Sequence, residues 1–229
     1  MDTVRPTPRT TVRQRPDRGS YDRAVIDAIL DEGLVCHVGF SVAGAPCVVP
    51  MNYARVGDRL VLHGARAGRL LSALAAGAPV CVAVTLLDGL VLARSAFRHS
   101  LNYRSVVVFG AATEVADRAE KRAALKAILE HVVPGRSRQV RPPSDGELDA
   151  TTVVALPLAE ASAKLRRGPP VDLEADRAAP CWAGEIPLRL AAGRARPDAG
   201  VAASRPRPQP PALPRLRPRR AAGRRRAKR

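Results

Sequence analysis

Residues 99–110 read His99-Ser-Leu-Asn-Tyr-Arg-Ser-Val-Val-Val-Phe-Gly110, a group of polar side chains followed by an apolar, β-branched run. A run of this kind predicts a buried strand. The polar residues place hydrogen-bond donors at the point where the chain enters the core, and a small ligand with phosphate or ring carbonyl groups can be held there. The stretch therefore predicts a strand and a ligand site at its entry.

Strand-like runs also lie on both sides of this stretch. They cover residues 34–42, 46–53, 59–63, 80–86, 89–95, 104–115 and 151–158. Turn signals at 43–45 and 56–58 predict that the first three runs form an antiparallel meander. With six or more short strands, we expect a mainly β fold, a small β-barrel with a few peripheral helices, in one domain.

Helical spacing of apolar residues predicts a few peripheral helices. The first begins after Ser20 as N-cap and ends at Gly33, a second covers 66–76, and a third runs from the capping pair Asp117 and Glu120 to residue 135. Residues 159–167 predict a further short helix, and residues 180–190 a last extended segment. Residues 1–19 are expected to form an extended arm.

The net charge of +17 over 229 residues is concentrated in the last 32 residues. Residues 198–229 hold eleven Lys or Arg and one acidic residue, whereas the body, residues 24–197, holds 21 basic and 17 acidic residues. We therefore expect a domain over 20–197 and a disordered Arg/Pro tail over 198–229. Two explanations fit this tail: an extension that binds nucleic acid, or an altered reading frame in a GC-rich gene.

The remaining composition excludes several classes of protein. No apolar segment has the length of a membrane span, and no signal peptide is apparent, so we expect a cytoplasmic protein. Cys36, Cys47, Cys81 and Cys181 lack paired spacing and are expected to be reduced core residues rather than metal ligands. Neither a Ser-His-Asp set nor a carboxylate pair emerges, as expected where a cofactor supplies the chemistry.

A second block, residues 59–71, predicts a strand that breaks at Gly64 and restarts as a helix. Backbone N–H groups at such a helix start, with Arg66 and Arg69, can receive a phosphate. Residues 48–53 precede this block, and Pro50 within them predicts an edge or bulged strand whose backbone can contact a ligand.

Together these segments resemble the pyridoxamine 5′-phosphate oxidase-like, FMN-binding split-barrel family, and within it the flavin-nucleotide-binding or nitroimidazole-resistance-like branch. The resemblance covers about residues 5–197. The motifs that carry it are residues 6–11, 18–23, 29–32, 36–39, 55–58, 62–64, 86–97, 99–110, 132–135, 162–170 and 182–184.

This resemblance implies a six-stranded split barrel that dimerises, with FMN in a groove at the dimer interface. It implies four groups of cofactor-binding residues. Pro50, Met51, Asn52 and Tyr53 would line the isoalloxazine ring; His63, Gly64, Arg66, Gly68 and Arg69 would receive the phosphate; Tyr103, Arg104, Ser105 and Val106 would form the other wall; and Trp182 would close the site. His99 is expected near the cofactor as well.

The sequence departs from the branch at the phosphate turn. Ala65 and Gly68 stand where the branch usually has hydroxyl side chains. Each missing hydroxyl removes a hydrogen bond to phosphate, so we expect weakened FMN binding. After Trp182 the chain offers Arg189 but no His, which argues against true oxidation of pyridoxamine phosphate.

Three functions remain open from the sequence. The first is an FMN-dependent oxidoreductase that takes hydride from NAD(P)H or another reductant and acts on a small molecule. The second is a binding protein that holds FMN, haem or a deazaflavin without turnover, because split barrels host all three. The third is nucleic-acid binding through residues 201–229.

Overall fold

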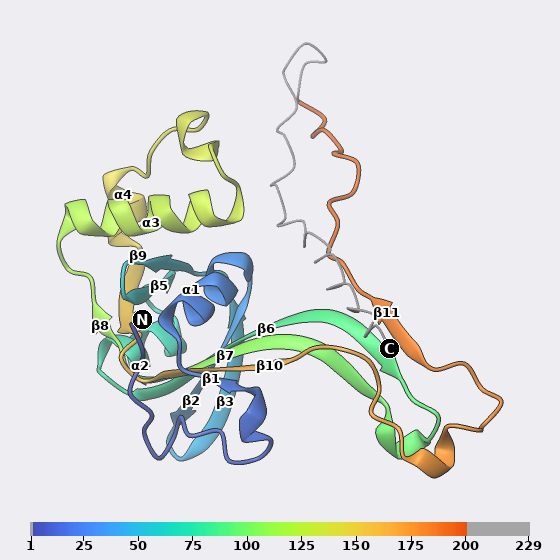
Figure 1. The fold of residues 1–229 in the computed structure, drawn as a ribbon. Coiled ribbons are helices and arrows are strands. Elements are labelled where there is room, and N and C mark those ends of the chain that lie inside the picture. The colour runs from blue at the N-terminus through green and yellow to red at the C-terminus, as the bar shows by residue number, and fades with distance from the viewer. Residues whose placement is uncertain (1, 201–229) are drawn as a thin grey trace. The chain divides into compact units, whose positions relative to one another are not determined.

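Two antiparallel sheets form the body of the fold in the computed structural model, which describes residues 2–200 (Figure 1). The large sheet has the order β1-β10-β7-β6-β2-β3, with β11 paired to β6, and the small sheet has the order β4-β5-β9-β8. The large-sheet strands are β1 (Gly19–Ser20), β2 (Cys36–Val42), β3 (Ala45–Met51), β6 (Pro79–Leu92), β7 (Ser100–Ala111), β10 (Ala161–Arg166) and β11 (Gly184–Pro187). The small-sheet strands are β4 (Ala54–Val56), β5 (Arg59–Ala65), β8 (Thr113–Glu114) and β9 (Thr151–Pro157). This is the predicted mainly β, split-barrel architecture, with two sheets in place of one closed barrel.

Four α-helices accompany the sheets in the described part of the chain: α1 (Arg23–Glu32), α2 (Arg69–Ala75), α3 (Arg118–Val132) and α4 (Asp145–Asp149). The first begins at Asp22, whose side chain accepts from Ala24 N, and not at the predicted Ser20. The predicted cap of α3 is present, because Asp117 accepts from Glu120 N. None of these helices is long and apolar enough to cross a membrane.

The main core lies between the large sheet, the small sheet, α1 and α2. Val38, Val82, Val106 and Val108 face it from the large sheet, Leu60 and Leu62 from β5, and Ile26 and Leu30 from α1. A second, smaller cluster joins the opposite face of the small sheet to α3 through Val61, Val153 and Ile128. The small sheet is thus covered on both faces.

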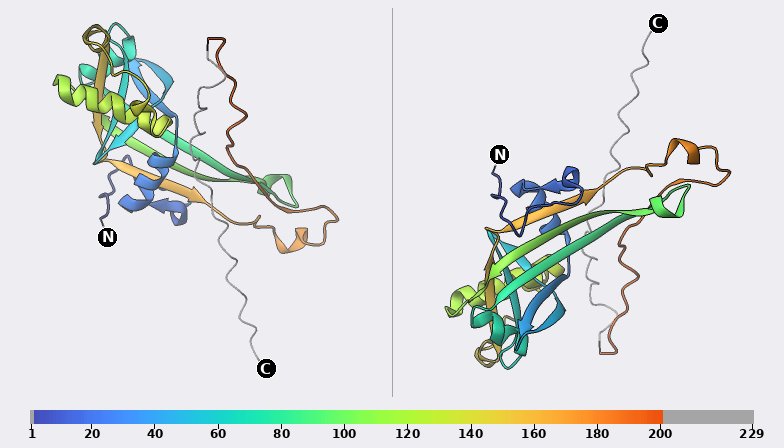
Figure 2. Two further views of the ribbon diagram at one scale, coloured as in Figure 1. Left: turned by 90° about the horizontal axis from the view of Figure 1, so that it is seen from above. Right: turned by 90° about the horizontal axis from the view of Figure 1, so that it is seen from below.

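Strands β6 and β7 continue beyond the body as a long ribbon, which we call the arm (Figures 1 and 2). The arm comprises residues 88–103 with β11, which pairs with β6 from Leu92 to Gly89. The two runs predicted as separate strands, 80–86 and 89–95, are one strand, because the register shift between Leu87 and Gly89 is a bulge and not a turn.

Two other predictions about the strands were wrong. The first three runs do not form one meander: β2 and β3 pair with each other, but the chain then changes sheets, and β5 pairs with β4 and β9. Residues 159–167 form a strand, β10, in place of the predicted helix. Strand β3 does lie at a sheet edge, as Pro50 predicts.

The N-terminal residues, expected to be an extended arm, pack against the sheets. Val4 lies in the core, Thr3 bridges to Asp22, and Arg9 lies over the Phe109 ring at 5.2 Å. The described residues up to Leu190 form one compact unit. Of the tail predicted over 198–229, residues 201–229 lie outside the described residues.

The four cysteines are free thiols, but they are not all core residues. Cys36 is buried, Cys47 and Cys81 are half-buried, and Cys181 is exposed. The expectation of a buried position was therefore wrong for Cys181, which follows Pro180 in a stretch without regular structure.

Candidate functional site

The large sheet has a face turned away from the core, which we call the outer face. Strand register places Pro50, His37, Ala83, Val107 and Ser162 in one row across five strands of this face. Successive side chains of a strand point to opposite faces of the sheet, so the residues directly before and after each member of the row point into the core. Ala83 and Val107 lie side by side in this row and have small side chains, so we call these two residues the flat row.

The predicted ring wall on β7 is split between the two faces of the sheet. Tyr103 and Ser105 share the outer face with Val107 and are half-buried. Val106 is fully buried in the core, and Arg104 also faces inward, with 7% of its surface exposed. The structure therefore brings Tyr103, Ser105 and Pro50 onto one face, and places Arg104 and Val106 on the other.

Arg104 is held by two carboxylates of the same chain. Its Nε and Nη2 donate to Asp88 at 2.9 and 2.7 Å, and its Nη1 and Nη2 donate to Glu32. The hydrogen bonds to Glu32, followed by those to Asp88, raise the pKa of Arg104. Its donors therefore join the end of α1 to the bulge of β6 and are not directed to a ligand.

Asn102 is also engaged within the chain. Its Nδ2 donates to Glu185 of β11 at 2.6 Å, and its Oδ1 accepts from Arg166 of β10. Asn102, one of the polar residues at the start of β7, thus connects β7 to β10 and β11 through side-chain hydrogen bonds.

The segment that connects the two sheets, residues 50–53, also faces in several directions. Pro50 and Asn52 are exposed, and Met51 packs against the core. Tyr53 is fully buried, and its hydroxyl donates to Leu30 O at 2.6 Å. Its burial raises its pKa, so Tyr53 is a neutral core residue.

The predicted phosphate turn lies at the end of β5 and the start of α2. The strand continues through Gly64 to Ala65, and Gly64 is where β5 approaches α2, since a Cβ there would lie 2.7 Å from Leu71 Cδ2. Gly68 N donates to Ala65 O and so closes the turn. Arg66 and Arg69 are exposed and contribute positive charge to it.

His63 is half-buried on β5 and points to the α3 side of the small sheet, as Val61 does two residues earlier. Its Nδ1 is shielded from solvent and has no hydrogen-bond partner among the described residues. Burial lowers the pKa of the ring, which is therefore neutral at pH 7. A neutral imidazole is the form that ligates metal ions.

These positions place the predicted groups on opposite sides of the protein. Tyr103 and Ser105 lie on the outer face of the large sheet, whereas His63 lies beyond the small sheet, with the main core between them. One chain alone therefore does not bring the predicted ring wall and phosphate turn to the same cavity.

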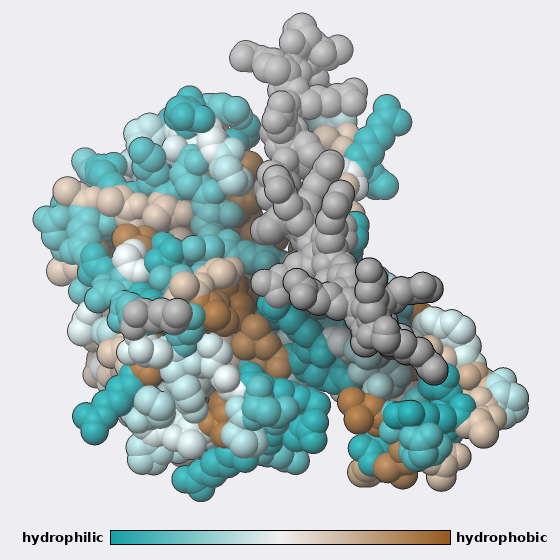
Figure 3. Space-filling model, in the orientation of Figure 1, coloured by the Kyte–Doolittle hydropathy of each residue, from teal (hydrophilic) through white to brown (hydrophobic). Residues whose placement is uncertain are grey.

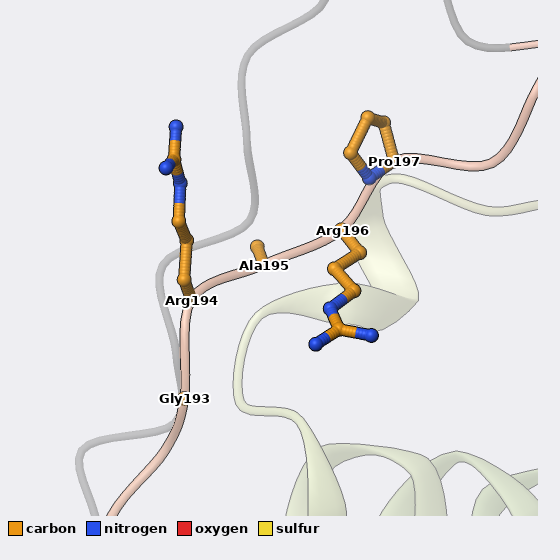
Figure 4. Close-up of a pocket in the computed structure, with 5 residues that line it drawn as sticks. All are labelled: Gly193, Arg194, Ala195, Arg196 and Pro197. Carbon is orange, nitrogen blue, oxygen red and sulfur yellow. The ribbon is translucent and has the colours of Figure 1, made fainter.

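Of two other predicted residues, His99 lies on the arm and Trp182 lies just before β11. His99 is exposed, and its Nδ1 lies 3.0 Å from Ser95 O. Trp182 is 64% exposed and packs beside Gly184. Figure 4 shows a shallow pocket in residues 193–197, formed by one continuous stretch that includes Arg194 and Arg196; it contains none of the predicted site residues.

Sequence reasoning missed the charged partners on neighbouring elements. The polar residues of β7 have acidic partners: Glu32 and Asp88 bind Arg104, and Glu185 binds Asn102. On β10, the outer face carries Lys164 and Arg166. Asp88 fell between two runs predicted as separate strands, 80–86 and 89–95, so its carboxylate was not assigned a place in the sheet. Residues 162–170 stood out only as part of the family resemblance.

Comparison with known proteins places the fold in a family. A family model described as pyridoxamine 5′-phosphate oxidase matches residues 22–165. The flavocytochrome Anf3 from Azotobacter vinelandii is 41% identical, with a TM-score of 0.83, and the match covers 89% of this chain and 95% of that one. The FAD and haem binding protein from Mycobacterium smegmatis is 40% identical, with a TM-score of 0.80, and the match covers 83% of this chain and 94% of that one.

A third solved structure, a candidate 5-nitroimidazole antibiotic resistance protein from Bacteroides thetaiotaomicron, is 27% identical, with a TM-score of 0.54. That match covers 64% of this chain and 85% of the other. No curated protein matches the sequence. The family model spans more than half of the chain, and the split-barrel sheets agree with it. The chain therefore belongs to the pyridoxamine 5′-phosphate oxidase family.

Proposed function

We propose that the protein binds a flavin and uses it as an oxidoreductase on a small molecule. The observation that carries this proposal is the extensive similarity to two flavin proteins, a flavocytochrome at 41% identity and an FAD and haem binding protein at 40% identity. The sequence resemblance favours FMN, and the second relative favours FAD, so the proposal is a flavin nucleotide of either kind.

The outer face of the large sheet fits a flat ring system. The flat row, Ala83 and Val107, is half-exposed and has little side-chain bulk. His37 and Pro50 continue it to the sheet edge, and Tyr103 and Ser105 lie on the same face of β7. A bound flavin would supply hydride transfer. The chain's own residues would orient the ring against this row and exclude water from one of its sides. Trp182, which is exposed just before β11, is the predicted cover.

The test of this proposal is the cofactor content of the purified full chain. We expect the flavin absorption bands, and release of FMN or FAD on denaturation, identified by chromatography. Anaerobic bleaching of the flavin by NAD(P)H would support the oxidoreductase, and a spectrum that NAD(P)H leaves unchanged would favour a carrier. A preparation that neither contains nor binds flavin would overturn the proposal.

A second candidate is haem binding, which one observation of the chain favours. His63 is neutral, and no hydrogen bond occupies its ring among the described residues, so it can serve as an axial ligand. The Azotobacter vinelandii protein is named a flavocytochrome, and the Mycobacterium smegmatis protein is named for binding both FAD and haem. We expect a Soret band that is lost in His63→Ala and kept in the control His99→Ala, whose ring lies exposed beside Ser95. An equal band in both variants would exclude His63.

We propose that the chain works as a homodimer. Large apolar side chains are exposed on and near the arm and on β3, and brown patches beside the arm and at its far end show some of them (Figure 3). They are Val48, Leu87, Leu90, Phe97, Leu101, Val171, Leu173, Trp182, Ile186 and Leu190. A second copy would cover them and could bring a phosphate turn to an outer face. Light scattering on the full chain should give twice the monomer mass, and a monomer at all concentrations would exclude the dimer.

A further inference from the structure

Positive side chains gather where β10 pairs with the N-terminal segment, and two of them, Lys164 and Arg166, lie on the outer face. We call this group, Arg15, Arg18, Lys164 and Arg166, the basic cluster. Gly19 pairs with Lys164 in the antiparallel register of β1 and β10, so Arg18 lies beside the residues that follow Lys164. Arg166 in turn pairs with Tyr103 on β7. The cluster therefore borders the flat row of the outer face.

Arg166 is a buried arginine without a direct carboxylate partner among the described residues. It is 7% exposed, and its guanidinium donates to Asn102 Oδ1, to Gly168 O at 3.0 Å and to Pro169 O at 3.2 Å. Its Nε, on the edge that arginines use for bidentate binding, has no partner. A buried cation with neutral partners retains most of its need for a counter-charge.

The neighbouring charges leave the cluster positive. Glu185 acts on Arg166 through Asn102, and Asp17 lies 3.8 Å from Arg15 while both remain mostly exposed. Lys164 Nζ donates to Gln14 O at 2.9 Å, which is a neutral partner. Burial lowers the pKa of Arg166, and the charge of Arg18 lowers it further. The four cations of the basic cluster thus have two carboxylates near them, Asp17 and Glu185. Glu185 is already hydrogen-bonded to Asn102.

We propose that the basic cluster binds a phosphate group of a nucleotide, at a site separate from the turn at Arg66 and Arg69. Phosphate is the anion that fits, since arginine offers parallel N–H donors and lysine a point charge to its oxygens. The site lies next to Tyr103, so a nucleotide held by its phosphate can place its ring on the flat row. This inference stands on the charges of the cluster and does not require the flavin proposal.

The test uses inorganic pyrophosphate and the full chain, measured by titration calorimetry. We expect Arg166→Gln and Arg18→Gln each to bind pyrophosphate about tenfold more weakly than the unmodified chain. The control is Arg98→Gln, which lies on the arm and stacks over Phe97 at 5.9 Å, and which should bind normally. All variants keep the same basic C-terminus, so a difference in their affinity for pyrophosphate comes from the substituted residue and not from the C-terminus. Arg18 forms no ion pair or side-chain hydrogen bond within the described residues, so Arg18→Gln keeps the test decisive if Arg166→Gln fails to fold.

Nucleotides then identify the source of the phosphate. If the flavin supplies it, both variants lose affinity for FMN or FAD and keep their affinity for riboflavin, which lacks phosphate. If a nicotinamide donor supplies it, flavin content stays constant and the KM for NAD(P)H rises. Equal pyrophosphate binding by the two variants and the control would overturn the proposed site, whatever the flavin content. An unmodified chain that holds no flavin but binds pyrophosphate, with weaker binding in the two variants, would contradict the flavin proposal only.

Discussion

At the scale of single residues, Gly33 shows how closely the core is packed where α1 ends. A Cβ at Gly33 would lie 2.5 Å from Val84 Cγ1 and 2.8 Å from the Tyr53 hydroxyl oxygen. The carbonyl oxygen of Gly33 lies 2.6 Å from His131 Nε2, within hydrogen-bond distance. Backbone φ is −72° there, so space and not backbone strain requires glycine.

We expect Gly33→Ala to lower the free energy of unfolding by about 1–3 kcal/mol, because an added methyl group must displace packed atoms. The control is Gly146→Ala in α4, where no atom lies within 4 Å of the added Cβ. That change should stabilise the protein by about 0.5–1 kcal/mol through helix propensity. Urea unfolding measures both. A loss of stability in Gly146→Ala as large as in Gly33→Ala would contradict this account.

Glu130 gives a prediction about pH. Hydrogen bonding by the Ser137 side chain, then by the backbone N–H groups of Gly135 and Ser137, lowers its pKa from 4.5 to about 2. A lowered carboxyl pKa stabilises the folded state above the ordinary value and loses that effect as the pH falls toward 2. Glu130→Gln should therefore destabilise the protein at pH 7 and much less at pH 3.

The measurement for Glu130 is urea unfolding at both pH values. Glu114→Gln is the control, because Glu114 is exposed on β8 and forms no side-chain hydrogen bond within the described residues. A stability difference for Glu130→Gln that stays constant from pH 7 to pH 3 would show that its charge does not hold the loop after α3.

At the scale of elements, Arg104 connects three of them. It lies on β7 and binds Glu32 at the end of α1 and Asp88 in the bulge of β6, and its side chain is only 8% exposed. The bulge marks where the arm leaves the body. The ion pairs therefore fix the base of the arm relative to the helix.

Arg104→Met should destabilise the protein by about 3–5 kcal/mol, because it leaves two largely buried carboxylates without their cation. Arg118→Met is the matched control. Arg118 also binds two carboxylates, Asp145 and Asp149, but its side chain is 52% exposed, and its loss should cost about 1 kcal/mol or less. Similar losses in thermal unfolding for the two variants would contradict a buried role for Arg104.

The elements also show what the sequence could and could not predict. The apolar runs of β7 and β9 and the caps of α3 are local signals, and they gave the correct element types. Residues 159–167 contain three Ala, the residue with the highest helix propensity, but pairing with all of residues 103–108 overrides that propensity. The partners of Arg104 lie 72 and 16 residues away, and no local pattern could identify them.

At the scale of the whole molecule, charge and fold are separable. Residues 201–229 contain eleven Lys or Arg and no acidic residue, whereas the compact unit ends at Leu190. Removing them lowers the formal net charge from +17 to +6. Truncation after Gly200 should therefore leave the thermal unfolding midpoint unchanged.

The same truncation tests the third function. If the basic segment binds nucleic acid, the full chain is retained on DNA at low salt, released steeply as salt rises, and no longer retained after truncation. Retention that survives truncation would assign DNA binding to the body. No retention of the full chain would exclude nucleic-acid binding by this segment.

Strand β3 has one more consequence, which concerns aggregation. It is an edge strand, and Pro46 and Pro50 lie in it four residues apart with exposed surfaces. Proline has no N–H to offer a further strand, so this edge is a poor template for strand addition. The protein can thus display this open edge in a crowded cell, because a strand of another molecule cannot readily extend the sheet at β3.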